Sequence, residues 1–361
     1  MGEKKSEQIE EIYFGIEEEA FGKTETRYGR QVLIPGWDQK KLSEASVLIV
    51  GVGAIGSFVA VNLALSGVGE LILVDMDTIE LSNLNRQLLF TSEDVGRSKA
   101  IVAAEKLRIL NPAIKISCYD DRVQEVPRAV LEKATILAAC LDTFRARRWV
   151  NSLAYDLKIP FVLSGMYAFL GQVQIIFPNE TPCFECNPLI GQDKLSQACT
   201  PLGEKRKSDR EIDIEERELG IPLPSIASMS SLIGGLITQE VIKIAIEIGK
   251  SINNYLFIDG LNNAFTEIEL AKNPNCPICG EKYKLEQVKV VVAPEETIKE
   301  LITRLSLMYG LTGINTRIIH KTKFMSEEKQ FQEIMTEGDK IFVIDESLAA
   351  PMVLLLTYGQ G

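Results

Sequence analysis

Residues 45–56 read ASVLIVGVGAIG, an apolar run that leads directly into three closely spaced glycines. A short continuous apolar run is typical of a strand buried on both faces of a parallel sheet. Gly51, Gly53 and Gly56 permit a tight turn and let a phosphate group approach backbone amides at the start of a helix, where the helix dipole favours an anion. The stretch therefore predicts a buried strand, a nucleotide-binding turn and a helix over residues 57–66.

The segments that follow continue an alternation of strands and helices. Residues 70–75 (ELILVD) predict a second buried strand that ends in an acid. The same patterns predict further strands over residues 115–119, 135–140, 161–165 and 171–177, and helices over residues 98–110 and 225–248. This order is typical of an α/β fold, so we expect a doubly wound, Rossmann-like mixed sheet.

A second, smaller unit is predicted toward the C-terminus. Residues 287–292 have the pattern of a strand, and residues 294–309 have that of an amphipathic helix with an early proline. Late strands are predicted over residues 316–320 and 340–344. A strand, one helix and more short strands within about 75 residues fit a small α+β, β-grasp-like domain.

The bulk composition limits the partners of the chain. Its 361 residues are 46% hydrophobic and 25% charged, values typical of a globular protein too long for one small core. The net charge of −11 disfavours nucleic acid, because such binding depends on Lys and Arg that neutralise phosphates. No uninterrupted apolar stretch approaches the ~20 residues of a membrane span, and the first residues are acidic rather than signal-like. We expect a cytoplasmic protein with no nucleic-acid or membrane partner.

The identity of the nucleotide depends on the residues after the glycines. Asp75, about twenty residues further on, could accept hydrogen bonds from a ribose, which fits NAD as well as ATP. The stretch from Asp77 through residues 83–87 (NLNRQ) to Lys99 places cations and amides beside the phosphates. An NAD-dependent dehydrogenase does not need this cluster, whereas an adenylating enzyme uses it to stabilise charge on phosphate oxygens. ATP is therefore favoured, with the dehydrogenase as the alternative from another class.

In order and spacing over residues 27–243, these motifs resemble the E1-like family of MoeB, ThiF, HesA and the ubiquitin E1 enzymes. The resemblance implies adenylation of the C-terminal carboxylate of a small ubiquitin-like protein that ends in Gly-Gly, with ATP and Mg²⁺. Asp75 would bind the ribose, and Asp142 would hold Mg²⁺. Arg30 would enter the site of a partner subunit, which implies a homodimer.

The same resemblance implies a set of phosphate-binding residues. Asn83, Arg86 and Lys99 would hold and polarise the triphosphate. Solvated surface charge is the alternative for Arg86, Lys99 and Asp142. The implied nucleotide-site residues are Gly51, Gly53, Gly56, Asp75, Asp77, Asn83, Arg86, Gln87, Lys99 and Asp142. Arg30, Arg86, Lys99 and Asp142 would act in the reaction itself.

Four of the seven cysteines form two Cys-x-x-Cys pairs, Cys183 with Cys186 and Cys276 with Cys279. Each pair can place two thiolates on one ion, and together they fill a tetrahedral site, so we predict one structural Zn²⁺. So few cysteines in so long a chain fit a reduced compartment, where such pairs indicate metal rather than disulfides. A redox-active pair is the alternative interpretation.

Cys199, followed by threonine, resembles the Cys-Thr that opens the crossover loop of thioester-forming E1 enzymes. Residues 198–225 would form that loop, and the charged stretch over residues 203–220 has almost no apolar residues to bury. The Cys199 thiolate would attack the acyl-adenylate, release AMP and hold the protein substrate as a thioester. In the alternative, the enzyme stops at the adenylate, as MoeB-like enzymes do, and Cys199 is incidental.

The resemblance divides the chain into three parts. An acidic arm would occupy residues 1–26, the adenylation domain residues 27–283, and a ubiquitin-fold-like domain residues 284–361. The last domain would recruit an E2-like conjugating enzyme. Two alternatives to a thioester-forming E1 are adenylate-only activation of a sulfur-carrier protein and an inactive E1-like scaffold.

Overall fold

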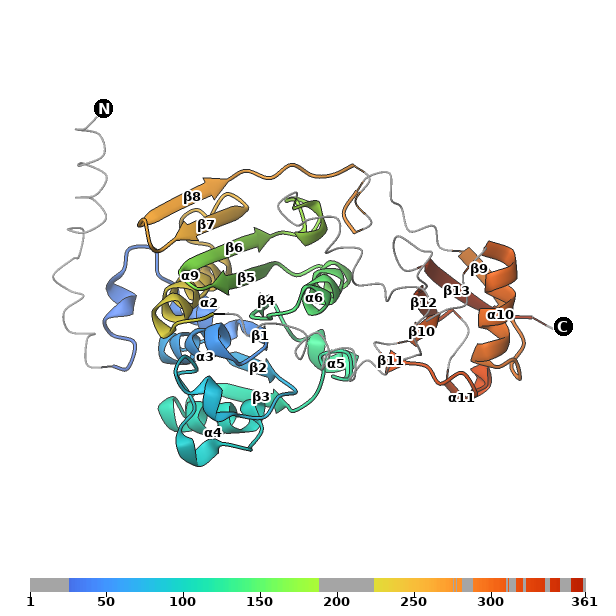
Figure 1. Ribbon diagram of the computed structural model, residues 1–361, viewed down its shortest axis with the longest axis horizontal. Helices are drawn as coiled ribbons and strands as arrows, with labels where there is room; N and C mark the ends of the chain where they lie inside the picture. Colours follow the sequence, from blue (N-terminus) through green and yellow to red (C-terminus); the bar gives the residue numbers. More distant parts are fainter. Residues whose placement is uncertain are drawn as a thin grey trace.

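The computed structural model contains two β-sheets that lie in separate stretches of the sequence (Figure 1). The large sheet has the strand order β3-β2-β1-β4-β5-β6-β7-β8, and the small sheet has the order β11-β10-β12-β13-β9. The structure describes residues 26–187, 224–274, 276, 278–280, 288–309, 311, 316–320, 323–334, 338–344 and 352–359.

The large sheet is parallel over five neighbouring strands and antiparallel beyond them. The parallel strands are β1 (Ser46–Val50), β2 (Glu70–Val74), β3 (Lys115–Tyr119), β4 (Ile136–Ala139) and β5 (Phe161–Tyr167). The antiparallel strands are β6 (Leu170–Ile176), β7 (Tyr255–Asp259) and β8 (Ala264–Ile268). The predicted Rossmann-like mixed sheet is confirmed.

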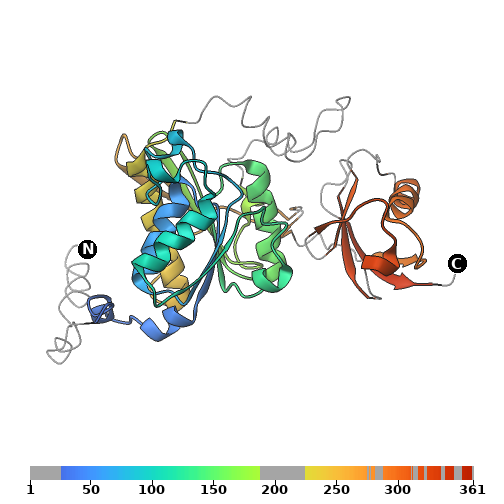
Figure 2. The ribbon, with the colours of Figure 1, turned by 90° about the horizontal axis from the view of Figure 1, so that it is seen from below.

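Helices cover both faces of this sheet (Figures 1 and 2). One face packs against α3 (Ala54–Ser66), α4 (Lys99–Leu110) and α9 (Ala227–Ile246), and the short helix α2 (Gln39–Glu44) lies beside α9. The other face packs against α5 (Arg128–Leu131) and α6 (Phe144–Leu157). The buried side chains of β1 alternate between the two cores, because successive strand residues point to opposite faces.

Helix α3 begins three residues earlier than its predicted start. Its first turn is closed by the hydrogen bond from the Ser57 amide to the Gly53 carbonyl, 3.0 Å long. The helix ends at Ser66 and is capped by Gly67, whose φ of +79° is the left-handed conformation that favours glycine. A β-carbon at Gly67 would lie 2.4 Å from the ring of Tyr28. The segment around Tyr28 is therefore packed against the C-terminal end of α3.

Helix α9 has the length and composition of a membrane span, with a mean hydropathy of 1.3 over its most apolar window. The core helix of a globular domain has the same properties, and half of this window is buried inside the protein. Ile233, Ile237 and Val241 belong to the core beneath α3. A β-carbon at Gly234 would lie 2.6 Å from the β-carbon of Phe58, so α3 and α9 cross closely. These contacts assign α9 to the core.

The C-terminal unit is a five-stranded mixed sheet with one long helix on one face (Figure 1). Its elements are β9 (Val288–Val292), α10 (Ile298–Tyr309), β10 (Arg317–His320), β11 (Lys323–Phe324), α11 (Phe331–Ile334), β12 (Lys340–Ile344) and β13 (Met352–Tyr358). Ile298, Leu301 and Leu305 of α10 are fully buried in its core. The predicted small α+β, β-grasp-like class is confirmed.

The predicted domain boundaries fall largely outside the described residues. Residues 281–287 contain the boundary after residue 283, and residues 1–25 make up nearly all of the predicted acidic arm. Residues 188–223 hold most of the predicted crossover loop. These divisions stay predictions.

Candidate functional site

The glycine turn lies at the carboxyl end of β1, directly against the end of β4. Gly51 has a φ of +88°, and a β-carbon there would lie 2.5 Å from the Cys140 carbonyl oxygen. A β-carbon at Gly56 would lie 1.9 Å from the Gly51 carbonyl oxygen. Strand β2 lies on one side of β1 and β4 lies on the other, so the strand order reverses at β1. Open sheets of this kind bind ligands at the carboxyl ends of the strands where the order reverses. Only glycine fits at positions 51 and 56 of this turn.

Asp75 follows β2 directly and holds the glycine turn in place. Its two carboxylate oxygens accept hydrogen bonds from the backbone amides of Val52, at 2.7 Å, and Asp77, at 2.9 Å. Burial raises the pKa of Asp75, and the charge of Lys99 together with these two hydrogen bonds opposes that rise. The remaining lone pairs of the carboxylate can accept hydrogen bonds from ribose hydroxyls.

A cation and a buried amide flank the turn. Lys99 at the start of α4 is buried, and its Nζ atom lies 3.0 Å from Oδ2 of Asp77. The side chain of Gln87 is buried, and its amide nitrogen would lie 3.6 Å from a β-carbon at Gly53. In the described part of the chain, Oε1 of Gln87 has no hydrogen-bond partner. A buried oxygen without a hydrogen-bond partner beside the turn could accept a hydrogen bond from a bound ligand.

Asn83 and Arg86 lie on the segment that carries Gln87. The Asn83 carboxamide oxygen accepts a hydrogen bond from the Glu80 amide at 3.0 Å and caps the short helix Leu81–Asn83. The Arg86 guanidinium donates to the Ser82 carbonyl at 2.7 Å and to Asn85 at 2.9 Å. The segment is thus ordered by its own side chains and leaves Arg86 partly exposed.

Asp142 lies on the turn after β4, and its side chain is exposed. The turn begins with the hydrogen bond from the Cys140 amide to the Val50 carbonyl, 2.9 Å long, which ties it to β1. It ends at Thr143, whose hydroxyl caps α6 by accepting a hydrogen bond from the Ala146 amide. Asp142 therefore stands beside the glycine turn, with oxygen ligands of the kind that Mg²⁺ prefers.

The structure brings most of the predicted nucleotide-site residues to one edge of the sheet. Gathered there are Gly51, Gly53, Gly56, Asp75, Asp77, Gln87, Lys99 and Asp142, while Asn83 and Arg86 lie on the segment that carries Gln87. Arg30 is exposed and lies elsewhere, in the segment packed against the C-terminal end of α3. Cys199 lies outside the described residues.

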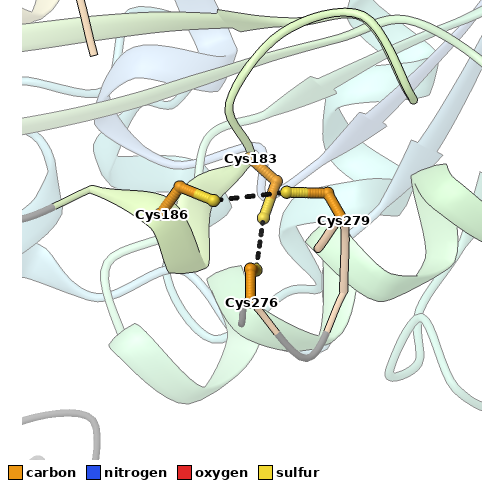
Figure 3. A group of neighbouring side chains, drawn as sticks. All are labelled: Cys183, Cys186, Cys276 and Cys279. Atoms are coloured by element: carbon orange, nitrogen blue, oxygen red, sulfur yellow. Dashed lines mark hydrogen bonds between the residues drawn. The ribbon is translucent and has the colours of Figure 1, made fainter. Parts of the chain in front are cut away.

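The four predicted zinc ligands converge at one point (Figure 3). Their sulfur atoms all lie within 4.8 Å of one another, with 3.5 Å between Cys183 and Cys276 and 3.2 Å between Cys186 and Cys279. A β-carbon at Gly280 would lie 2.6 Å from the backbone nitrogen and oxygen of Cys276, so this turn requires glycine. Four converging thiols fit one tetrahedral Zn²⁺ better than two separate redox pairs.

Buried amides that the sequence analysis did not single out hold the first of these pairs. The Asn151 carboxamide oxygen of α6 accepts a hydrogen bond from the Phe184 amide at 3.2 Å. The Asn254 side chain donates to the Pro182 carbonyl at 3.1 Å and to the Ile175 carbonyl at 3.0 Å. The chain thus enters the cluster through hydrogen bonds to α6 and to Asn254, which precedes β7 and is itself bonded to β6.

Comparison with known families decides where the chain belongs. The model of the ThiF family matches residues 28–278, a stretch that contains the glycine turn, Lys99 and Asp142. The chain belongs to the ThiF family. Its membership disfavours the dehydrogenase alternative.

Relatives of this ThiF-family chain are adenylyltransferases and E1 enzymes. It is 33% identical to the sulfur carrier protein adenylyltransferase of Thermus thermophilus over 268 residues, which cover 71% of this chain and 91% of that protein. Its alignment with the NEDD8-activating enzyme E1 catalytic subunit of Caenorhabditis elegans is 400 positions long, has 28% identity, and covers 89% of this chain and 92% of that protein. The crystal structure of E. coli MccB with ATP superimposes with a TM-score of 0.59 at 25% identity, over 78% of this chain and 82% of that one.

Proposed function

We propose that this ThiF-family chain uses ATP and Mg²⁺ to adenylate the C-terminal carboxylate of a small ubiquitin-like protein that ends in Gly-Gly. The observation that carries the proposal is the glycine turn with Asp75, Lys99 and Asp142 around it, in the fold that MccB shares. The relatives named above are a sulfur carrier protein adenylyltransferase and a NEDD8-activating E1 subunit, which supports a protein substrate of this class.

The chemistry requires charge stabilisation rather than a base. The substrate carboxylate is already ionised and attacks the α-phosphorus, and pyrophosphate leaves with the displaced electron pair. The backbone amides at the start of α3 would bind the phosphates, and Lys99 and Arg86 would neutralise the charge that develops on their oxygens. Asp142 would hold Mg²⁺, which when bound neutralises the departing pyrophosphate.

A pyrophosphate-exchange assay with a panel of Gly-Gly-ending proteins tests the proposal. We expect ATP-dependent exchange of labelled pyrophosphate with at least one ubiquitin-like or sulfur-carrier protein and none without a protein substrate. An inactive scaffold would show no exchange with any member of the panel. Exchange with a protein whose terminal glycines are deleted would contradict the proposed substrate class.

The placement of Arg30 supports a homodimer in which each subunit completes the other's site. The side chain of Gln31 donates to the Ser66 carbonyl at 2.6 Å, which fixes this segment at the C-terminal end of α3. The glycine turn is at the opposite end, and a helix of 13 residues is about 20 Å long. Arg30 is therefore remote from the nucleotide turn of its own chain, as an arginine that serves the partner subunit would be.

Complementation tests this arrangement. Arg30→Ala and Asp142→Ala should each lose exchange as homodimers, because each removes one half of every shared site. Mixed after dissociation and reassociation, they should recover about half of the wild-type exchange rate per heterodimer, because one of its two sites then has both residues intact. A random mixture, in which about half of the dimers are heterodimers, should recover about a quarter. No recovery in heterodimers verified by differential tagging would contradict supply from the partner.

We further propose that the adenylate is passed to Cys199 as a thioester and then to an E2-like enzyme bound by the C-terminal unit. The match to the NEDD8-activating catalytic subunit covers 89% of this chain, against 71% for the sulfur carrier protein adenylyltransferase. The longer match supports an E1 with an additional C-terminal domain. The alternative, adenylate-only activation of a sulfur-carrier protein, is supported by the higher identity of 33% to the shorter relative.

Removal of Zn²⁺ from the four-cysteine site should lower the thermal stability of the protein without changing the residues of the nucleotide site. The four thiols join the end of β6 to the segment after β8, so an ion bound by them crosslinks distant parts of the chain. We expect metal analysis to find one Zn²⁺ per chain in protein purified in a reducing buffer. Such a buffer matches the cytoplasm, which we propose as the location of the protein. Cys276→Ser should abolish stoichiometric zinc and lower Tm by roughly 5 °C or more. Cys118→Ala should keep the zinc, and a metal-free wild-type protein would contradict the site.

A further inference from the structure

Arg147 is a buried arginine behind the Asp142 turn. It lies in the second turn of α6 and is 7% exposed, although a charged side chain on a helix is usually solvated. Its Nε and Nη2 atoms both donate to the Leu141 carbonyl, at 3.0 and 2.8 Å. Leu141 immediately precedes Asp142, so the guanidinium fork holds the peptide that carries the acid.

The space around this guanidinium is shaped for it. A β-carbon at Gly165 in β5 would lie 3.0 Å from Nη2 of Arg147 and 2.9 Å from the amide nitrogen of Gln172. Glycine at this position therefore leaves room for both side chains. Burial lowers the pKa of Arg147, and the Asp142 carboxylate is the largest of the charges that oppose this.

Three sets of contacts together restrict the turn that presents Asp142. The Cys140 amide donates a hydrogen bond to β1, and the Thr143 hydroxyl caps α6. Between these two residues, the Leu141 carbonyl accepts both hydrogen bonds from Arg147. A carboxylate on a fixed turn loses less freedom when it binds a cation than one on a free loop. Lysine would not replace arginine here, because a single ammonium group has no planar fork.

We propose that Arg147 is a positioning residue that fixes the Asp142 turn so that the carboxylate meets the Mg²⁺ which accompanies ATP. The inference rests on the proposed function, because it takes the triphosphate to bind at the glycine turn. The inference predicts that loss of Arg147 weakens Mg²⁺-dependent ATP binding even in a protein that folds normally. Loss of such a supporting group typically weakens metal binding tenfold or more.

Calorimetric titration of the full-length protein with ATP, in saturating Mg²⁺ and in EDTA, measures this effect. Arg147→Gln should weaken ATP binding about tenfold in Mg²⁺ and leave the weaker binding in EDTA unchanged. Arg147→Lys should fall between wild type and Arg147→Gln. The control is Arg128→Gln, which removes an ion pair with Asp156 at the other end of α6 and should leave the Mg²⁺ effect intact.

A second variant keeps the test decisive if Arg147→Gln does not fold. Gly165→Ala should displace the guanidinium without removing its charge and should cause the same Mg²⁺-specific loss. Folded variants that keep the wild-type Mg²⁺ effect, or that lose equal affinity in EDTA, would overturn the assignment. Wild-type protein that binds Mg²⁺ and ATP but exchanges pyrophosphate with no Gly-Gly-ending protein would instead overturn the proposed function and leave the role of Arg147 standing.

Discussion

Replacing Asp142 by alanine should abolish ATP–pyrophosphate exchange and leave the fold intact. The carboxylate is exposed on a turn whose backbone is held by other residues, so its removal should change the free energy of unfolding by less than about 0.5 kcal/mol. Without it, Mg²⁺ and the triphosphate lose the side chain proposed to orient them. We expect exchange to fall by about a thousandfold, measured with saturating ATP and substrate protein.

The matched control for this variant is Asp156→Ala on the same side of the sheet. Asp156 is an exposed acid near the C-terminal end of α6 and pairs with Arg128 rather than with anything near the glycine turn. It should keep near wild-type exchange. Exchange by Asp142→Ala within about threefold of wild type would show that the acid is only solvated surface charge.

Much of the nucleotide site could be predicted because its residues lie in local motifs. Gly51 and Gly56 are recognisable because a side chain at either position would collide with backbone at the end of β1 or β4, and their spacing is a local motif. Asp77 and Lys99 pair across 22 residues, but both lie within the stretch that carries the resemblance. Their mutual contact could not be predicted from spacing alone.

Arg147 could not be singled out from the sequence. It belongs to FRARRW at residues 144–149, where several arginines on one helix read as a solvated face. Only the packing of α6 shows that this one turns inward to the Leu141 carbonyl. The spacing does indicate that an arginine five residues after Asp142 lies close enough to contact the turn. It does not indicate which of the arginines is buried.

Long-range pairing explains the other omissions. Asn254 holds the backbone near Pro182, a contact between residues 72 positions apart, and no local pattern indicates it. Strand β13 was not predicted, although its apolar run pairs in parallel with β9 more than 60 residues earlier. Strand β8 lies at the sheet edge with most of its residues exposed, so its sequence lacks the apolar pattern of a buried strand.

The second large effect concerns Cys199, which should form a thioester with the protein substrate. Incubation with ATP, Mg²⁺ and the cognate Gly-Gly-ending protein should give a covalent adduct that dithiothreitol cleaves, seen on a non-reducing gel. Cys199→Ala should lose the adduct completely and keep pyrophosphate exchange. Adenylate formation precedes thiol attack and uses the phosphate-binding residues instead.

The other free cysteines outside the zinc cluster provide the controls for this variant. The Cys140 thiol packs behind the glycine turn, and burial raises its pKa to about 12, so its reactive thiolate is scarce at neutral pH. Cys118 lies in β3 against the core. Cys118→Ala and Cys140→Ala should keep both the adduct and the exchange. Robust exchange by wild type without any reductant-sensitive adduct would place the chain with the adenylate-only members of its family, and the C-terminal unit would then need a role other than recruitment of an E2-like enzyme.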